Sequence, residues 1–423
     1  MTMRAGLPIL FDCSRMVARG LAGRMPTGID RVCEAYRAHF AARAQTQAVV
    51  QVRGRARVLS AAHSARLFDL LAAPGEGFRR RLAALAAQVV ASGAGPAPTP
   101  GALYLNVSHS DFDRDAHHGW LRAGGVRPVY LLHDLIPIAH PDFTTAHKTA
   151  RHEGRVRRAL EAASGIIANS HATAAAIRAY AHSVGLRLPP LLEAPLGATD
   201  LPVPALPPGL PPRATFVCVS TIETRKNHML LLDVWQRLIA QLGERAPRLE
   251  LIGRWGLGSE AVRRRYRSDP YLHRFITIRN QCDDDAIARA LVGARALLAP
   301  SRAEGFGLPV AEALRLGVPV IASDLAAFRE IGGAVPTYLD PAASEAWLRM
   351  IREFAADGPE RQRQLAMLRA WRAPDWRDHF ALVEAWLERL LRPVPITLAE
   401  RAQPAVDWPA PIAPDRAVAG GRR

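Results

Sequence analysis

Cysteine is scarce in this sequence, and its spacing excludes two kinds of stabilised protein. The four cysteines, Cys13, Cys33, Cys218 and Cys282, lie far apart and form no Cys-x-x-Cys pair. Such spacing argues against a structural zinc site and against a disulfide framework, and it suits a reducing cytoplasm.

Long apolar runs are also missing. No window approaches the ~20 apolar residues that a membrane-spanning helix needs. The N-terminus has one arginine followed by a very short apolar run, LPILF, which makes a poor signal peptide. We therefore expect a cytoplasmic protein.

Lysine is nearly absent, which makes each lysine position informative. Of the 55 basic residues, only Lys148 and Lys226 are lysines. The net charge is +16, and most of the excess falls in the first half of the chain. Such a surplus can serve nucleic acid, an anionic membrane or a phosphate-bearing substrate, although a solvated surface of biased composition gives the same count.

The length and the hydrophobic pattern predict more than one α/β domain. Short apolar runs alternate with helical patterns along all 423 residues, which is typical of largely parallel sheets. Strands are predicted in the first half at 7–11, 47–52, 102–107, 128–132, 165–169 and 191–195. In the second half they are predicted at 215–220, 248–253, 275–280, 296–301, 319–323 and 336–340. The clearest helices are at 149–163, 227–242, 284–293 and 308–316.

A proline-rich spacer at 201–213 separates two Rossmann-like domains, expected at 1–200 and 214–373. An amphipathic helix follows at 374–392, and the Pro- and Ala-rich segment 393–423 is expected to be disordered. Two such domains suggest a cleft between them. Because ligands of open parallel sheets bind beyond the carboxyl ends of the strands, chemistry is expected in the loops that follow strands.

The stretch EGFGLPVAEA follows a predicted strand and carries two carboxylates, Glu304 and Glu312. Pro309 suits the first turn of a helix, so Glu304 lies in the loop and Glu312 lies near the helix start. Gly305 and Gly307 allow close approach, and the helix N-terminus offers free N–H groups to an anion such as phosphate. Taken alone, the two glutamates are better explained as surface acids at a helix start, but the full string from Glu304 to Ser323 is much harder to obtain by chance.

Two further strand ends carry candidate residues. Arg225 and Lys226, in the segment TRKNH, come between a strand and a helix, and a compact ammonium is a good partner for a diphosphate. His133 and Asp134 end another strand, where a histidine can hydrogen-bond a sugar hydroxyl or a phosphate oxygen. Exposed loop cations and a structural histidine satisfied by its neighbour are the alternatives.

The loop after the first strand predicts a weaker anion site. In PTGIDRV, Gly28 opens a helix and Arg31 projects from its first turn, facing the cleft from the other domain. Arg15, Arg19 and Arg24 precede this turn and are available to an acidic acceptor or a membrane.

Together, EGFGLPVAEA with GVPVIASD, the TRKNH segment and the HDLIP segment resemble the retaining family-4 glycosyltransferases of the GT-B fold. The resemblance runs in order from about residue 7 to about residue 340, most of the chain. PTGIDRV also resembles a glycine turn of bacterial mannosyltransferases in that family, with Asp30 replacing the second glycine and Val32 replacing a tyrosine.

The resemblance implies a role for each candidate residue. Glu304 would contact hydroxyls of the donor sugar, and Glu312 would hold the nucleotide ribose. Arg225 and Lys226 would neutralise the diphosphate, and His133 would lie near the transferred sugar and the leaving phosphate. The backbone around the diphosphate would come from Gly305, Phe306, Gly307 and Leu308, with Gly28 assigned to the same donor site.

The implied activity is transfer of a sugar, with mannose as one candidate, from a nucleoside-diphosphate sugar to a glycan or lipid-linked glycan in surface-polysaccharide synthesis. The first domain would hold the acceptor, with Arg31 and Asp134 on that side, and the helix at 374–392 would cross back to it. No cofactor and no metal ion are expected, because Arg225 and Lys226 supply the positive charge. Peripheral contact with an anionic membrane at the cytoplasmic face is a further expectation, and no nucleic acid is expected as a partner.

Other interpretations rest on particular segments. The Asp-x-Asp patterns in HSDFDRDAHH, from Asp111 to Asp115 with flanking histidines, could hold a divalent ion or face the acceptor. Asp283 and its neighbouring acids suit an ordinary helix start. A sugar-nucleotide epimerase or a phosphorylase is an enzymatic alternative, the latter needing a lysine for pyridoxal phosphate. A basic protein that binds nucleic acid is a third, but the arginines are dispersed and show no aromatic interleaving.

Overall fold

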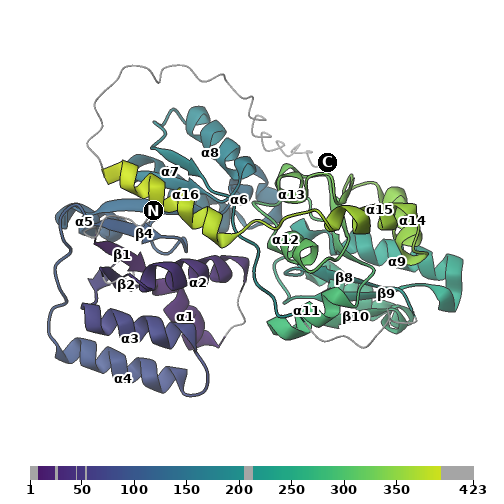
Figure 1. Cartoon of the computed structure of the whole chain (residues 1–423), viewed down its shortest axis with the longest axis horizontal. Coiled ribbons are helices and arrows are strands. Elements are labelled where there is room, and N and C mark those ends of the chain that lie inside the picture. The colour runs from purple at the N-terminus through teal and green to yellow at the C-terminus, as the bar shows by residue number, and fades with distance from the viewer. Residues whose placement is uncertain (1–7, 24–26, 44, 53–54, 204–212, 392–423) are drawn as a thin grey trace, which may run out of the picture.

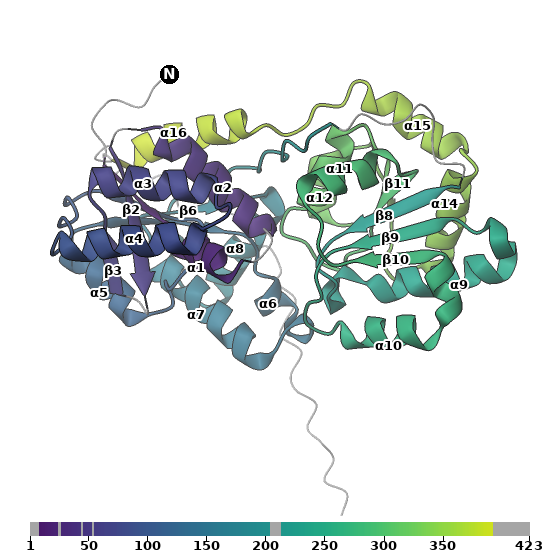
Figure 2. The same ribbon diagram turned by 90° about the horizontal axis from the view of Figure 1, so that it is seen from below.

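The structure is a computed structural model that describes residues 8–23, 27–43, 45–52, 55–203 and 213–391. It contains two α/β units side by side, one from the earlier and one from the later part of the chain (Figure 1, Figure 2). Most of the predicted spacer at 201–213 and all of the predicted tail at 393–423 lie outside the described residues.

The first domain is built on a seven-stranded sheet in the order β3-β2-β1-β4-β5-β6-β7. Its strands are β1 (Ile9–Asp12), β2 (Thr46–Val52), β3 (Arg55–Val58), β4 (Leu103–Asn106), β5 (Arg127–Leu132), β6 (Gly165–Ala168) and β7 (Leu191–Glu193). The pairings are parallel, except that β3 pairs antiparallel with β2 at the edge.

Helices cover both faces of this sheet. Ile9 and Phe11 of β1 pack into one core cluster, whereas Leu10 between them packs into another, as the two-residue period of a strand requires. The helical segments are α1 (Ser14–Ala22), α2 (Gly28–Ala41), α3 (Ala61–Ala72), α4 (Phe78–Ala91), α5 (Asp115–Ala123), α6 (Ile136–Ala139), η1 (Pro141–Phe143), α7 (Ala146–Ala162) and α8 (His171–Ser183). A sheet buried on both faces explains why its strands read as continuous apolar runs.

The second domain has a six-stranded, fully parallel sheet in the order β10-β9-β8-β11-β12-β13. Its strands are β8 (Thr215–Val219), β9 (Arg248–Ile252), β10 (Ile276–Arg279), β11 (Ala296–Ala299), β12 (Val320–Ser323) and β13 (Thr337–Leu339). Its helical segments are η2 (Thr224–Lys226), α9 (His228–Leu242), η3 (Gly243–Arg245), α10 (Glu260–Ser268), η4 (Pro270–Arg274), α11 (Asp284–Val292), α12 (Leu308–Arg315), α13 (Ala326–Gly332), α14 (Ser344–Ala355) and α15 (Pro359–Leu368). In both sheets the order reverses next to the first strand, which is where α/β proteins bind ligands.

Every predicted strand is present within a few residues of its expected bounds. The strand that sequence reasoning missed is β3, whose sequence RARV alternates arginine with apolar residues and is half-exposed at the sheet edge. A half-exposed edge strand lacks the apolar run that identified the buried strands.

The last helix, α16 (Trp376–Leu391), returns from the second domain and lies against the first (Figure 1). His379 Nε2 and Tyr36 Oη are hydrogen-bonded at 2.8 Å, and Arg127 Nη2 donates to the carbonyl of Leu390 at 2.7 Å. Gly165 on β6 makes room for this helix, because a Cβ there would lie 2.4 Å from the ring of Trp386. The first domain therefore contains residues from both ends of the described chain.

Candidate active site

Lys226, Arg225 and Glu304 form a buried ion cluster in the loops that follow β8 and β11, which are neighbours in the sheet. Lys226 Nζ donates to Glu304 Oε1, and Arg225 Nη1 donates to Glu304 Oε2 at 3.0 Å. Ser301 Oγ also donates to Glu304 Oε1, at 2.7 Å. The structure therefore brings together candidates that the sequence separates by 78 residues.

Burial and pairing together set the charges of this cluster. Burial raises the pKa of Glu304, but Lys226 and Arg225 outweigh it and hold this pKa at about 2. The pKa of Lys226 is lowered, because burial and the neighbouring Arg225 together outweigh the opposite effect of Glu304. For Arg225, burial lowers the pKa, and Glu304 with Glu223 raises it above its ordinary value. Glu304 is thus ionised at neutral pH and is the counter-ion of two buried cations.

The N-terminus of α12 lies beside this cluster. Gly307 precedes the helix with a φ of 116°, a backbone conformation that favours glycine, and an added Cβ would lie 2.6 Å from the ring of Phe328. Pro309 occupies the first turn as predicted, and Phe306 is buried beneath the loop. The positive end of the helix dipole therefore lies beside the strand ends, where it favours an anion.

Glu312 is buried in the cleft and has one oxygen without a hydrogen bond. Only 3 % of the residue is exposed, and its Oε1 accepts no hydrogen bond in the structure. Arg31 of the first domain places Nη1 at 3.4 Å from this oxygen, and another Arg31 nitrogen pairs with Asp284. Burial raises the pKa of Glu312, while Arg31 lowers it. A buried carboxylate oxygen without a donor is suited to a ligand hydroxyl.

A cavity of about 170 Å³ lies between the domains in front of Glu312. The second domain supplies residues after β8, β9 and β10, including Ser220 and Gly253, together with Leu308 at the start of α12. The first domain closes it with Gly28 and Arg31, and a Cβ on Gly28 would lie 3.5 Å from Leu308 Cδ1. Gly28, Arg31, Leu308 and Glu312, all predicted from sequence, line this one cavity.

Gly305 faces the first domain and makes a direct contact between the two. Ser170 Oγ and Thr173 Oγ1, at the start of α8, donate to the carbonyl of Gly305 at 2.6 and 3.1 Å. A Cβ on Gly305 would lie 2.2 Å from the carbonyl oxygen of His133. Sequence reasoning missed Ser170 and Thr173, although their position directly after the strand β6 was a usable signal.

His133 and Asp134 follow β5 as predicted, but their side chains are used by the first domain itself. His133 is buried, and its Nε2 donates to the carbonyl of Val107 at 2.8 Å. Burial lowers its pKa to about 4, so the ring is neutral with its proton on Nε2 and Nδ1 is the acceptor nitrogen. Asp134 accepts from the backbone N–H of Ile136 at 3.0 Å and thereby closes the turn that leads into α6.

The expectation that Arg15 and Arg19 are available to an acidic ligand is wrong for these two side chains. Arg15 Nε pairs with Asp30 at 2.7 Å, and Arg19 Nη2 pairs with the same carboxylate at 3.1 Å. Asp30 also accepts from the backbone of Thr27 in a capping box at the start of α2. Asp30, which replaces a glycine of the resembled motif, therefore tethers α1 to α2, while Arg24 lies outside the described residues.

Two carboxylates of the Asp-x-Asp cluster form ion pairs with arginine side chains. Asp113 pairs with Arg151 and Arg155, and Asp115 pairs with Arg158. The flanking His109, His117 and His118 turn inward and bond to Leu131 O, to Gln51 with Tyr130, and to Phe112 O, respectively. Among the described residues, no group of three or more His, Cys, Asp or Glu side chains is arranged to hold a metal ion.

Asp283 has the ordinary role that sequence reasoning offered for it. Its side chain accepts from the backbone N–H of Ala286 at 2.8 Å and so forms the N-cap of α11.

A comparison with protein families finds a match for the second domain, which supplies most of this site. Residues 213–357 match the family described as Glycosyl transferases group 1. The second domain is a group 1 glycosyltransferase domain. This group 1 domain contains the whole Arg225–Lys226–Glu304 cluster and Glu312.

Curated relatives extend the likeness beyond this domain. The chain is 27% identical over 259 residues to the serotype-specific mannosyltransferase WbdA of Escherichia coli. The matched region covers 56% of this chain and 31% of WbdA. It is 32% identical over 127 residues to the O-antigen chain mannosyltransferase B of Escherichia coli, covering 29% of this chain and 32% of that protein. The chain therefore matches about a third of the length of these relatives.

Solved structures show that both domains together adopt the GT-B fold. Anabaena HepE, solved in complex with UDP and glucose, superposes with a TM-score of 0.60 at 18% identity, covering 91% of this chain and 99% of HepE. The predicted fold class is therefore confirmed. None of the described helices combines the length and the apolar character needed to span a membrane.

Proposed function

We propose that the protein is a retaining glycosyltransferase that moves a sugar from a nucleoside-diphosphate sugar to a glycan or lipid-linked glycan. Mannose is the proposed sugar and surface-polysaccharide synthesis the proposed setting, because the curated relatives are a serotype-specific and an O-antigen chain mannosyltransferase. The group 1 domain supports the reaction class.

The observation that carries the proposal is the pair of cations held beside the start of α12. Arg225 and Lys226 are partly buried at the strand ends, next to the positive end of that helix. Breaking the bond between the anomeric carbon and the donor phosphate leaves negative charge on the diphosphate. Preorganised cations and a helix N-terminus stabilise such charge without reorganisation.

Glu304 and Glu312 then divide the recognition of the donor. A diphosphate would replace Glu304 as counter-ion of the two cations, which frees this carboxylate to accept from hydroxyls of the sugar. Glu312 Oε1, which accepts no hydrogen bond in the structure, suits a ribose hydroxyl in the 170 Å³ cavity. The ribose hydroxyl would thus supply the hydrogen bond that this buried carboxylate oxygen lacks.

The transfer itself needs no nucleophile from the protein. The acceptor hydroxyl attacks the anomeric carbon on the face that the phosphate leaves, the new C–O bond forms as the old one breaks, and the hydroxyl proton passes to the departing phosphate. His133 stays neutral and can accept a hydrogen bond from a sugar hydroxyl at Nδ1. We also propose that no metal ion and no cofactor takes part, because Arg225 and Lys226 supply the charge that a divalent ion would otherwise bring.

Thermal unfolding with nucleotides tests this proposal, and the chain offers a matched control. GDP, UDP, TDP and ADP are each added with EDTA to the wild type, to Lys226→Ala and to Lys148→Ala. A nucleotide at 100 times its Kd should stabilise the fold by about 2.7 kcal/mol. We expect one nucleotide to shift the melt of the wild type and of Lys148→Ala, whose lysine is exposed on α7, and to lose its effect on Lys226→Ala.

Two results would overturn the assignment. If no nucleotide shifts the wild type, the cluster around Glu304 is not a donor site. If a shift appears only with a divalent ion, the metal-independent form of the proposal is wrong.

A further inference from the structure

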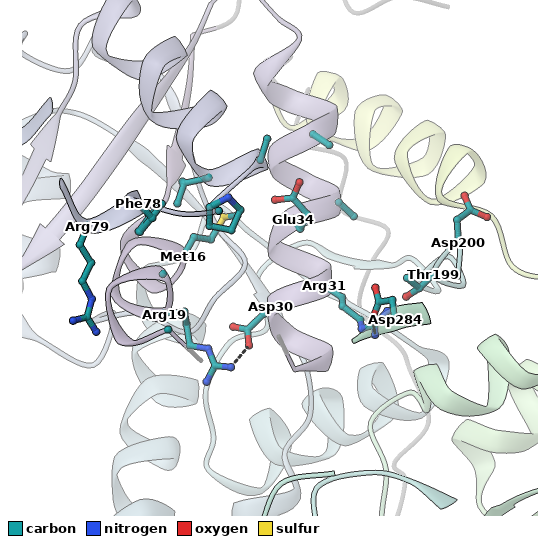
Figure 3. A pocket seen from close by; sticks show the side chains of 18 of the residues that line it. Met16, Arg19, Asp30, Arg31, Glu34, Phe78, Arg79, Thr199, Asp200 and Asp284 are labelled. Atoms are coloured by element: carbon teal, nitrogen blue, oxygen red, sulfur yellow. Dashed lines mark hydrogen bonds and ion pairs between the residues drawn. The ribbon is translucent and has the colours of Figure 1, made fainter. Parts of the chain in front are cut away.

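A second and much larger cavity is lined mostly by the first domain. Its volume is about 1090 Å³, and it is bounded by α1, α2 and the connection between α3 and α4 (Figure 3). The apolar part of its wall includes the large side chains of Met16, Leu71 and Phe78. The small residues Gly20, Ala35 and Ala38 also line the cavity. The ring of Phe78 packs directly on Gly20, where a Cβ would lie 2.5 Å from it.

This α1–α4 cavity adjoins the donor site through Arg31. Arg31 lines both the α1–α4 cavity and the 170 Å³ cavity in front of Glu312. Asp284 of the second domain and Thr199 line the same end, and Figure 3 shows them grouped beside Arg31, across the cavity from Arg79. A molecule bound here would therefore lead toward the place where the donor sugar is expected.

The carboxylates that line the α1–α4 cavity are each paired with an arginine. Asp30 pairs with Arg19, and Asp284 with Arg31. The other two pairs are Glu34 with Arg37 and Asp200 with Arg315. Their negative charge is thus balanced by neighbouring cations.

Arg79 and Arg80, at the start of α4, have a different environment. Both are exposed, and neither has a carboxylate partner among the described residues. Within the described part of the chain, Arg79 Nε donates to the backbone carbonyl of Leu21 at 2.9 Å. The start of α4 therefore presents two arginines without an ion-pair partner among the described residues, next to the apolar side chain of Phe78.

We propose that the α1–α4 cavity binds the acceptor and that this acceptor is a lipid phosphate or diphosphate carrying a glycan. The inference rests on the proposed function and specifies its acceptor. The phosphate lies against Arg79 and Arg80, the first part of the lipid chain packs on Met16 and Phe78, and the glycan runs along α2 to the cleft.

Apolar side chains beside two arginines without ion-pair partners favour this amphiphile over a neutral glycan. A glycan alone would hydrogen-bond to the polar side chains of the lining but would leave the apolar surface of Met16, Leu71 and Phe78 without a partner. An apolar ligand without charge would leave Arg79 and Arg80 unused.

Binding of dodecyl phosphate, measured by titration calorimetry below its critical micelle concentration, tests the proposal. Dodecyl maltoside has the same alkyl chain with a neutral head group. Comparing the two ligands therefore separates the contribution of the charged head to binding from that of the alkyl chain. Ala38→Trp narrows the cavity, and Ala84→Trp, exposed on α4 outside the lining, is its control. Arg79→Gln with Arg80→Gln removes the charge, and Arg264→Gln, exposed on α10, controls for a lost arginine.

We expect dodecyl phosphate to bind the wild type, Ala84→Trp and Arg264→Gln alike. Ala38→Trp should weaken binding at least tenfold, and the double arginine variant should reduce it to the level of dodecyl maltoside. Equal binding to Ala38→Trp, stronger binding of the maltoside, or formation of a dimer that excludes both amphiphiles would overturn the proposal.

The nucleotide melt separates this failure from failure of the proposed function. Ala38→Trp should keep the nucleotide-induced shift of the wild type, which also shows that the variant folds. Loss of amphiphile binding with a retained nucleotide shift supports the α1–α4 cavity as the acceptor site. A wild type that responds to nucleotide but not to dodecyl phosphate leaves the transferase proposal intact and removes the lipid acceptor.

Discussion

At the scale of single residues, Glu304 has the most constrained environment in the site. It accepts from Lys226, Arg225 and Ser301 while its side chain is only 10% exposed. Removing one partner of a buried pair is costly because the other charge is left without compensation. The same carboxylate therefore contributes to the stability of the protein and, in the proposed reaction, to recognition of the donor sugar.

The first prediction concerns Glu304→Gln. We expect a loss of about 3 kcal/mol in the free energy of unfolding at pH 7, because Lys226 and Arg225 lose their shared counter-ion. Since the pKa of Glu304 is about 2 in the folded state and ordinarily 4.5, its contribution is complete above pH 4.5 and disappears as the pH falls toward 2. Urea unfolding at pH 7 and at pH 3 measures this difference.

Glu345→Gln is the control, because Glu345 pairs with Arg237 on the surface and its side chain is 64% exposed. Its loss should cost less than about 1 kcal/mol. A difference between the wild type and Glu304→Gln that stays constant from pH 7 to pH 3 would contradict the ionised state of Glu304.

At the scale of elements, the loop between β11 and α12 joins the domains through Gly305. This loop accepts hydrogen bonds from the start of α8 and lies against the backbone that follows β5. The loop therefore sets the distance between the donor cluster and the first domain, in addition to leading into α12.

The second prediction concerns Gly305→Ala. The new Cβ would lie 2.2 Å from His133 O, and backbone cannot move aside as a flexible side chain can. We expect a loss of about 1–3 kcal/mol in stability together with a weaker nucleotide-induced shift. Thermal unfolding with and without nucleotide measures both.

Gly154→Ala is the matched control, because Gly154 lies inside α7 with nothing within 4 Å of an added Cβ. It should leave the nucleotide shift unchanged and raise stability by about 0.5–1 kcal/mol. A Gly305→Ala protein with the melt and nucleotide response of the wild type would show that the domains separate at this point at no cost.

The elements also show what sequence reasoning can and cannot reach. Buried parallel strands were predictable because continuous apolar runs are their signature, whereas β3 has an arginine at every second position and was missed. The candidate residues after strands were predictable because parallel strands end at one edge. The bond from Ser170 to Gly305 was not, because it joins residues 135 apart and depends on how two domains pack. The α1–α4 cavity could not be predicted either, because small residues such as Ala38 form no sequence pattern that indicates a cavity beside them.

At the scale of the whole molecule, buried neutral histidines make the fold sensitive to acid. Burial lowers the pKa of His133, His228 and His379 to about 4, and that of His117 to about 3. Because their folded pKa values lie below the ordinary 6.5, the unfolded chain binds more protons between these limits, and stability falls as the pH falls.

The third prediction is therefore a melting temperature that is nearly constant above pH 7 and decreases below pH 6.5. Each such histidine contributes up to about 3 kcal/mol to the loss by pH 4. His379→Gln should reduce the slope, whereas His147→Gln, exposed on α7, should not. Melting curves at half-unit steps from pH 8 to pH 4.5 measure it, and a flat profile would contradict the neutral, buried state of these rings.

The return of α16 to the first domain has a consequence for synthesis on the ribosome. Gly165 is made more than 200 residues before Trp386, the side chain that covers it. Until that helix leaves the exit tunnel, the apolar surface around Tyr36 and Gly165 faces solvent, even if the sheet behind it has already formed. The second domain can complete its core earlier, so the domain translated first is the last to be finished.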